Sequence, residues 1–405
     1  MSQFPTPPTA PSLSDPANFD TRTDAFLAWM TTIAAQWNAT EPYIQGDDAI
    51  LASLSATSLV VNGNNYPSAG SLSNRTLIIN GAMQVAQRGT SVAGATAGGY
   101  LTADRWKASI GLAGTWTATQ EADGPSGFAN SFKMECTTAS VSLDVAAYLY
   151  LHHPMEGQNL QQLKKGLATA SPVTLSFWVK SNKTGTYHTG LEDQDNARLR
   201  GVGFTVDVSG VWEYKTVTFE GDTVGALDND ANSSLELHYW LAAGTNYTGG
   251  GGSGAWAAAV NGNYADTLAV NLADTIGNYF QITGVQLEVG DKATPFEHRS
   301  YAQELALCQR YYQFYGGETT SMIFQGVASG AETWYPTVLF PVEMRASPTG
   351  TKQGAWVESN IADHVLQSAW LKKSHFGRKV ASAASGSFYV YADSSSAKYT
   401  FDAEL

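Results

Sequence analysis

Short runs in which apolar and polar residues alternate fill the chain from about residue 77 to residue 300. The clearest runs are residues 132–136, 173–180, 212–219 and 234–241, and clusters of Gly, Asn and Asp separate them. Alternation with a period of two, rich in β-branched and aromatic residues, is typical of strands that bury one face. No long helical period interrupts the runs. The pattern predicts one large antiparallel β-sandwich of the jelly-roll type over residues 77–300.

A glycine-rich segment at residues 248–254 lies inside this β region. Taken alone, such a run is typical of a flexible linker between two domains. The β pattern resumes after it, however, and continues to about residue 300. We therefore expect this segment to be a surface loop of the sandwich.

A helical period precedes the β region. Asp15 can cap a helix that has Pro16 at its first position. Apolar residues then recur at spacings of four, three and four, and they form one seam: Phe26, Met30, Ile33 and Trp37. Such a seam predicts a short bundle or coiled coil formed with copies of the same chain. An amphipathic helix packed on its own domain is the alternative.

The N-terminal part of the chain divides into an arm, this helix and a connector. Five of the 14 prolines lie within residues 1–17, which predicts an extended arm, with a disordered terminus as the alternative. We assign residues 1–54 to attachment and oligomerisation. Residues 55–76 are polar and contain the turn signal Asn62-Gly63, which predicts a connector with a small hairpin.

Helical character returns at residues 301–315, and Gly316-Gly317 ends it. Five residues of this segment share one face of the expected helix: Tyr301, Leu305, Cys308, Tyr312 and Tyr315. The remaining residues, 316–405, are again rich in β-formers. The sequence thus predicts a mainly β protein in which a helix over residues 301–315 bridges the sandwich and a small C-terminal β domain.

Composition and charge narrow the functional classes. Charged residues make up 15% of the chain, and the 39 glycines suit short strands joined by turns. The net charge of -13 disfavours binding to the phosphate backbone of nucleic acids. No apolar run reaches the length of a membrane span, and the first residues lack the pattern of a secretory signal. We expect neither membrane insertion nor a nucleic-acid partner.

Only two cysteines occur, Cys136 and Cys308, and they lie far apart in the sequence. This excludes a disulfide framework and fits a protein made in a reducing cytoplasm. A role outside the cell would then require release by lysis.

Two stretches nearly 200 residues apart form a signature that we interpret as the first and last strands of the sandwich. The first is NRTLIINGAMQVAQRG at residues 74–89, followed by TADRW at residues 102–106. The second is ITGVQLEVG at residues 282–290, which leads into ATPFEHR at residues 293–299. Together with ELALCQRYY at residues 304–312 and the last residues, FDAEL, the signature resembles a recurrent architecture of bacteriophage and prophage tail fibres.

This resemblance covers residues 74–405 and implies a structural fibre or spike protein of a virion, commonly a homotrimer. Residues 1–54 would then attach it to other virion proteins. The middle sandwich is also similar to jelly-roll carbohydrate-binding modules, at residues 176–180 and 212–215, which implies contact with glycans of the host surface. A purely structural protein that decorates the head or the tail is the alternative.

Candidate glycan contacts follow from the chemistry of sugars. Flat aromatic rings stack on sugar C–H faces, while amide and carboxylate groups hydrogen-bond the hydroxyls. The best candidates flank the glycine-rich segment, and two further tryptophans follow them: Tyr247, Trp256, Asn246, Asn261, Asn263, Trp116 and Trp212. A place in the sandwich core is the alternative for each tryptophan. We assign Trp106 and Trp178 to the core.

One run resembles the start of a calcium-binding loop because Asp228, Asp230 and Asn232 alternate with other residues. It departs from the EF-hand pattern, since Ser233 stands where glycine is needed and Tyr239 where the bidentate glutamate should be. We therefore expect a solvated Asx turn and no metal here, with a structural calcium site as the alternative. No other cofactor is expected.

No enzyme motif stands out. The pair His152-His153 lacks a cysteine or a spaced third histidine, so we expect no zinc site there. Neither G-x-S-x-G nor H-E-x-x-H occurs. A polysaccharide-degrading tailspike is the enzyme alternative, but it needs a set pair of carboxylates, and none of the 36 acidic residues is singled out. We expect a binding protein without catalytic activity.

Overall fold

The computed structural model describes residues 25, 27–32, 59–61, 64–66, 74–251, 254–319, 322–367 and 371–405. The chain divides into two compact units, Met1–Thr57 and Ser58–Leu405. In the first unit, residues 25 and 27–32 are helical, and the Met30 side chain is half exposed. Phe26, Ile33 and Trp37 of the predicted seam lie outside the described residues. Self-association through this seam therefore stays a prediction.

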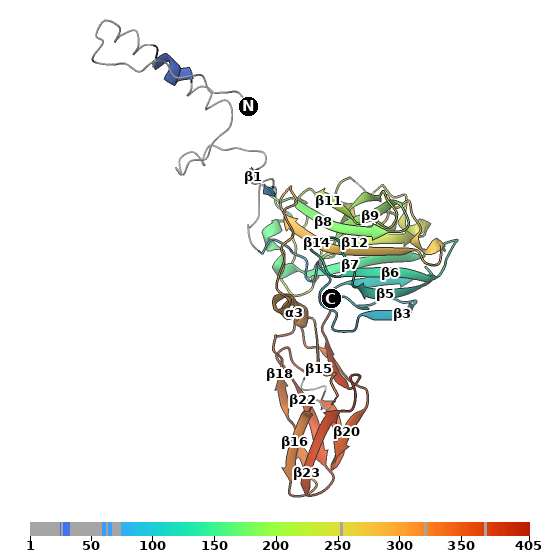
Figure 1. Cartoon of the computed structure of the whole chain (residues 1–405), viewed down its shortest axis with the longest axis vertical. Coiled ribbons are helices and arrows are strands. Elements are labelled where there is room, and N and C mark those ends of the chain that lie inside the picture. The colour runs from blue at the N-terminus through green and yellow to red at the C-terminus, as the bar shows by residue number, and fades with distance from the viewer. Residues whose placement is uncertain are drawn as a thin grey trace, which may run out of the picture. The chain divides into compact units, whose positions relative to one another are not determined.

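The second unit contains the predicted sandwich, which consists of two six-stranded antiparallel sheets (Figure 1). The strands of the first sheet, which we call the β12 sheet, are in spatial order β13 (Ala257–Ala258), β10 (Arg198–Val206), β9 (Gly185–Asp193), β12 (Ser233–Ala243), β7 (Tyr148–Glu156) and β4 (Lys107–Gly111). Those of the second, the β14 sheet, are β11 (Glu213–Phe219), β8 (Val173–Ser181), β14 (Tyr279–Val289), β6 (Ser131–Thr138), β5 (Thr115–Glu121) and β3 (Ser91–Ala95). The predicted mainly β fold with a jelly-roll sandwich is confirmed.

Alternation along each strand separates the core from the outer faces of the sheets. In β12, Leu235, Leu237 and Tyr239 are buried in the core between the two sheets. Successive side chains of a strand point to opposite faces, so Glu236, His238 and Trp240 belong to the outer face of the β12 sheet. Burial of each large apolar side chain in such a core stabilises the fold by roughly 1.5–3 kcal/mol.

The opening half of the signature does not form a strand. Residues 77–79 have no strand conformation, although the Leu77 amide donates a hydrogen bond of 2.8 Å to the Leu287 carbonyl. The first strand of the sandwich along the chain is β3, so the prediction of a strand at residue 77 is wrong. The closing half does form β14, the last strand of the sandwich along the chain, which lies between β8 and β6.

The two halves of the signature nevertheless pack against each other. The buried Asn80 has a φ of 59°, and its side-chain amide donates to the backbone carbonyls of Val85 and Asp104. The Trp106 indole N–H in turn donates to the Asn80 carbonyl at 3.1 Å. A Cβ on Gly81 would lie 2.1 Å from the Val285 carbonyl oxygen, so only glycine permits this approach. The signature is thus explained by close backbone packing.

The helix after the sandwich is shorter than predicted. It is α3 (Tyr301–Gln309), with a capping box made by Ser300 and Gln303. Residues 312–316 form strand β15 (Tyr312–Gly316), which pairs with β24 (Lys398–Asp402). The predicted helical face is therefore wrong: Tyr312 and Tyr315 lie on a strand, and Tyr301 is 56% exposed. Aromatic residues favour strands, and the available partner strand decided the conformation.

The C-terminal residues form three small antiparallel sheets, with orders β15-β24-β19, β16-β23-β20 and β17-β22-β18, and β21 also pairs with β22. Their further strands are β16 (Met322–Ala328), β17 (Thr333–Trp334), β18 (Thr337–Leu339), β19 (Thr349–Gln353), β20 (Trp356–Ser359), β21 (Ile361–Gln367), β22 (His375–Ser382) and β23 (Gly386–Ala392). Phe340, Phe376 and Phe401 pack in their main core. The β-rich character predicted for this region is confirmed.

Polar contacts connect this C-terminal part to the sandwich. The buried Arg105 guanidinium forms an ion pair with Glu404 and lies 3.5 Å from the centre of the Tyr311 ring. Arg310 donates two hydrogen bonds to the carboxylate of Glu156, the last residue of β7. Arg310 and Tyr311 directly follow α3, so the end of this helix is held against the sandwich.

Short elements complete the described chain. Strands β1 (Leu59–Val61) and β2 (Asn64–Tyr66) pair with each other and form the small hairpin expected in the connector. One-turn 3-10 helices occur at η2 (Gly157–Asn159), η3 (Gln161–Leu163), η4 (Thr245–Tyr247), η5 (Asn261–Asn263) and η6 (Leu272–Asp274). Among the described residues, no helix is long and apolar enough to cross a membrane.

Candidate functional site

The outer face of the β12 sheet carries a ladder of aromatic and polar side chains. Strands β7 and β12 are paired so that Tyr150 lies opposite Trp240 and His152 lies opposite His238. Residues directly opposite each other in an antiparallel pair project to the same face, with Cβ atoms about 5 Å apart. The alternating sequence of two neighbouring strands thus places these four side chains together.

Above this ladder is a hollow of about 400 Å³, which we call the Trp240 hollow. Its lining comes from β7, β9, β12, the short helices η4 and η5, and the residues that directly follow β9 and η5: Tyr148, Tyr150, Glu192, Gln194, Glu236, Trp240, Tyr247, Asn261 and Tyr264. A volume of this size is within the range of small-ligand sites.

Aromatic rings form one side of the Trp240 hollow. Trp240 stacks on Tyr150 with ring centroids 4.5 Å apart and an angle of 25° between the planes. Its ring also lies 5.4 Å from that of Tyr247 and 6.0 Å from that of Tyr264. Trp240 is only 2% exposed, whereas the tyrosines are half-buried. Trp240 therefore supports the tyrosine rings, and the tyrosines present their surfaces to the hollow.

The indole N–H of Trp240 is a free donor in this lining. It is buried and has no hydrogen-bond partner among the described residues. An unsatisfied buried donor of this kind costs about 1–3 kcal/mol.

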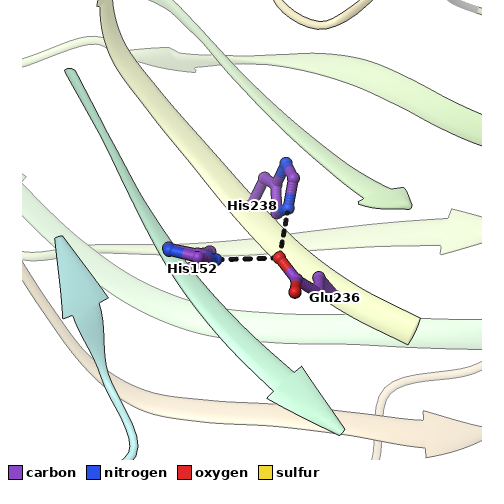
Figure 2. Close-up of side chains that lie close together, drawn as sticks. All are labelled: His152, Glu236 and His238. Atoms are coloured by element: carbon purple, nitrogen blue, oxygen red, sulfur yellow. Dashed lines mark hydrogen bonds and ion pairs between the residues drawn. The ribbon is translucent and has the colours of Figure 1, made fainter. Parts of the chain in front are cut away.

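Two carboxylates give the hollow its polarity. Glu192 accepts a hydrogen bond of 2.6 Å from the Tyr264 hydroxyl. The Glu236 Oε2 atom lies 2.8 Å from His152 Nδ1 and 3.2 Å from His238 Nε2 (Figure 2). Glu192 and Glu236 are register partners on β9 and β12, so the two carboxylates are neighbours.

The protonation of this group follows from burial and hydrogen bonding. Burial raises the pKa of the Glu236 carboxyl, but the hydrogen bonds with His152 and His238 outweigh it and lower this pKa well below its ordinary value. Burial lowers the pKa of His152, and the neighbouring Glu236 only partly opposes this. At neutral pH, Glu236 is therefore ionised and His152 is neutral.

A second hollow, of about 380 Å³, lies on the β14 sheet, and we call it the Trp178 hollow. Its lining is mostly aromatic or small: Ser126, Gly127, Phe128, Ser176, Trp178, Tyr214, Gly284, Pro295, Phe296 and His298. The rings of Phe128 and Phe296 meet edge to face, with centroids 5.0 Å apart. Trp178 is only partly buried, so its assignment to the core is wrong, whereas Trp106 is a core residue as predicted.

The structure brings two of the predicted glycan contacts into the Trp240 hollow. Tyr247 and Asn261 line it, and the exposed Asn246 lies beside Tyr247 on η4. Their role in binding stays a prediction.

The other predicted contacts lie elsewhere. Trp116 is fully buried in the core, and its indole N–H donates to the Ala113 carbonyl, so the prediction of a ligand contact is wrong. Trp256 donates to the Glu220 carbonyl at 2.8 Å, and Asn263 is buried and donates to the Ala258 carbonyl. Trp212 lies near Asp123, with 3.5 Å between Nε1 and Oδ1. None of these four lines either of the two large hollows.

The calcium-like run forms the Asx turn that the sequence favoured. The Asp230 carboxylate accepts a hydrogen bond of 2.8 Å from the Asn232 amide, which is an Asx turn, and Asp228 is exposed. Within the described ranges, one group of three His, Cys, Asp or Glu residues is close enough to hold a metal ion, and it consists of His152, Glu236 and His238. Sequence reasoning did not bring these three residues together, and the expectation that His152 holds no zinc stays a prediction.

Sequence reasoning missed the ladder itself. Leucines alternate with ring-bearing polar residues in the run Tyr148-Leu149-Tyr150-Leu151-His152. This alternation was the available signal for a strand with a functional outer face. The partners on β12 follow about 90 residues later, and only the strand pairing brings them together.

Comparisons with known proteins give a partial likeness of fold. No protein-family model matches the chain, and no curated protein matches it. Among solved structures, the enzymatically active domain of tailspike protein 4 from bacteriophage CBA120 is 11% identical, with a TM-score of 0.26, and the match covers 53% of this chain and 21% of that chain.

Two carbohydrate-binding domains give similar values. A xylan-binding domain from Paenibacillus barcinonensis is 10% identical, with a TM-score of 0.25, and the match covers 56% of this chain and 98% of that one. The family 11 carbohydrate-binding module from Clostridium thermocellum, in complex with a mixed-linked tetrasaccharide, is 9% identical, with a TM-score of 0.24, and the match covers 47% and 91%. At these TM-scores the likenesses carry no argument about function.

Proposed function

We propose that the sandwich binds a glycan in the Trp240 hollow. The observation that carries this proposal is the combination of tyrosine rings and two carboxylates in one lining, together with the unpartnered indole N–H of the lining residue Trp240. Aromatic rings offer stacking surfaces to sugar C–H faces, and fixed polar groups select the positions of hydroxyls. The Trp178 hollow, of nearly equal volume, has no carboxylate in its lining.

Each part of the lining has a role in the proposed complex. The half-buried faces of Tyr150 and Tyr247 stack on sugar rings. Glu192, Gln194 and Asn261 exchange hydrogen bonds with hydroxyls, and the Trp240 N–H donates to an oxygen at the base of the hollow. Because the lining contains carboxylates and the chain carries a net charge of -13, we propose an uncharged or cationic glycan.

We propose binding without hydrolysis. A glycosidase needs one carboxyl whose raised pKa keeps it protonated as a general acid. The pKa of Glu236 is lowered instead, because two histidines hydrogen-bond its ionised form. The neighbouring carboxylates Glu192 and Glu236 make hydrolysis the competing function. Release of reducing ends from the bound polysaccharide by the intact chain, and its loss in Glu192→Gln, would favour that competitor.

We further propose that the chain is a fibre or spike component of a bacteriophage virion, attached through residues 1–54. The resemblance of residues 74–89 and 282–299 to tail-fibre proteins supports this. A homotrimer would present three hollows, so that weak single sites act together on a host surface. A decoration protein that binds no sugar is the alternative, and immunogold labelling of virions would locate the chain on the head or the tail.

Glycan binding is tested with the full chain on an array of bacterial surface glycans, followed by calorimetry with the glycan that binds. We expect saturable binding that Tyr150→Ala weakens. Tyr214→Ala, in the Trp178 hollow, is the matched control and should bind normally. A folded protein that binds no glycan on the array would contradict the proposal and favour the purely structural role.

A further inference from the structure

Three side chains at the edge of the Trp240 hollow have the arrangement of a metal site (Figure 2). His152 on β7 and His238 on β12 are register partners, and Glu236 precedes His238 by two residues on the same face of the strand. The imidazole rings lie 5.6 Å apart and nearly perpendicular, at 87°. Strand pairing therefore directs three potential ligands from two adjacent strands to one point.

The distances between the ligand atoms suit a small divalent ion. One ligand atom from each residue lies within 4.8 Å of the other two. Glu236 Oε2 is 2.8 Å from His152 Nδ1 and 3.2 Å from His238 Nε2. Ligands that bind zinc tetrahedrally at 2.0–2.2 Å lie about 3.3–3.5 Å from one another. The three residues would need only small movements to bind an ion.

A shell of further contacts orients these ligands. The Ser109 hydroxyl lies 3.2 Å from His152 Nε2, the ring nitrogen that faces away from Glu236. Ser233 donates to the other Glu236 oxygen at 3.2 Å. Contacts of this kind fix ring orientation and raise metal affinity. Glu192 Oε2, 3.4 Å from His238 Nε2, is close enough to become a fourth ligand.

The donor set selects the class of ion. Calcium and magnesium prefer oxygen ligands, whereas two imidazoles with one carboxylate suit zinc and its transition-metal neighbours. The side chains are also shielded, with exposures of 6% for both histidines and 16% for Glu236.

We propose that His152, Glu236 and His238 bind one divalent zinc-class ion, with Glu192 or a water molecule as the fourth ligand. The ion cross-links β7 and β12 beside Tyr150, whose ring lies 5.2 Å from that of His152 and 5.3 Å from that of His238. It would thereby fix the base of the Trp240 hollow. The proposal does not depend on glycan binding.

The test uses the full chain, stripped of metal with EDTA and dialysed, and contains no sugar. Titration with Zn²⁺ should give one ion bound per chain and a higher Tm. Co²⁺ serves as a spectroscopic probe. Bound at this site, it should give the visible absorption bands of a four-coordinate ion with nitrogen ligands. No saturable Zn²⁺ binding, or a Co²⁺ spectrum equal to that of the hydrated ion, would overturn the proposal and leave a hydrogen-bonded His–Glu–His group.

Variants assign the site to its residues. His238→Ala and Glu236→Gln should each weaken Zn²⁺ binding by about tenfold or more, whereas His298→Ala, in the Trp178 hollow, should leave it unchanged. Circular dichroism in EDTA shows whether each variant is folded. If His238→Ala does not fold, the assignment rests on Glu236→Gln, because glutamine keeps the shape and size of the glutamate side chain. Wild-type affinity in folded Glu236→Gln, or an equal loss in His298→Ala, would exclude this site.

Discussion

The two outer faces of the sandwich carry hollows of nearly equal volume and opposite chemistry. The Trp240 hollow, of about 400 Å³, has two carboxylates and two amide side chains among its tyrosines. The Trp178 hollow, of about 380 Å³, has phenylalanines, a proline and no acidic side chain. Because the volumes are alike, size does not distinguish the two faces. The carboxylate and amide groups that can fix a ligand's orientation are on only one of them.

The difference arises from what borders each hollow. The signature segment after β14 contributes Pro295, Phe296 and His298 to the Trp178 hollow, and the rings of Phe296 and His298 pack against each other with centroids 4.8 Å apart. The segment that follows β14 therefore packs on this face of the sandwich. The Trp240 hollow is bordered instead by η4 and η5, two short helices that flank the glycine-rich loop.

The largest expected effect is acid destabilisation from the face that carries the Trp240 hollow. Burial lowers the pKa of His188 on β9 to about 4, although the nearby Asp266 raises it. Between pH 6.5 and 4, the unfolded chain binds a proton at this residue and the folded chain does not, so stability is lost as the pH falls. We expect a loss of about 2–3 kcal/mol at the lower limit.

Urea denaturation at pH 7 and at pH 4.5 measures this effect in the wild type and in His188→Gln. The variant should lose less stability between the two pH values. An equal pH dependence in both proteins would show that His188 is not the cause. His298→Gln, on the opposite face, serves as the comparison variant.

The second effect concerns ligand affinity. Tyr150→Ala removes a stacking surface and should cost about 2 kcal/mol, or roughly 30-fold in Kd, for the glycan identified on the array. Tyr214→Ala should change that Kd little. Calorimetry with both variants tests the comparison directly, because the reverse result would move the binding site to the Trp178 hollow.

The third effect concerns stability without binding. Gly284 has a φ of 60°, and a Cβ there would lie 2.7 Å from Phe128 Cζ. We expect Gly284→Ala to lower the free energy of unfolding by about 1–3 kcal/mol and to leave glycan affinity unchanged. Gly277→Ala is the matched control, since its φ is 84° but nothing lies near the added Cβ. An equal loss in both variants would indicate backbone strain alone and no collision in the Trp178 hollow.

The smallest expected effect isolates one donor. Trp240→Phe keeps an aromatic ring under the tyrosines but removes the indole N–H. We expect the glycan Kd to rise by about threefold to tenfold, equivalent to about 1 kcal/mol. Trp178→Phe should leave the Kd unchanged. An unchanged Kd in Trp240→Phe would mean that the indole N–H makes no hydrogen bond to the ligand.

The sequence predicted the strands better than their partners. Alternation at residues 234–241 predicted β12 and the separation of its two faces, but it did not reveal that Trp240 lies opposite Tyr150. Pairing between strands 90 residues apart depends on the topology of the whole sheet. Alternation also does not show which of the two sets of alternating residues faces the core. For this reason Trp178 was assigned to the wrong side of β8.

The helix prediction failed for a related reason. The aromatic run from Tyr311 to Tyr315 fits a helical spacing and also a strand, and β24 supplied the partner that local reasoning did not include. The site residues Glu192 and Tyr264 were missed because neither stands in a recognisable motif. Glu192 lies on β9, and Tyr264 lies in the chain after β13. Only the folded loop brings the Tyr264 hydroxyl to the Glu192 carboxylate.

The walls of the Trp240 hollow have a consequence for how its proposed glycan specificity could change. Its base is fixed by the register of β7 and β12, whereas Tyr247 and Asn261 stand on short turns on either side of the glycine-rich loop. The Gly250 amide binds the Gly262 carbonyl, so this loop is closed at its own base. If the hollow binds a glycan as proposed, we expect insertions and exchanges in the loop to change which sugar it accepts while strand pairing stays intact, so that specificity and stability can vary independently.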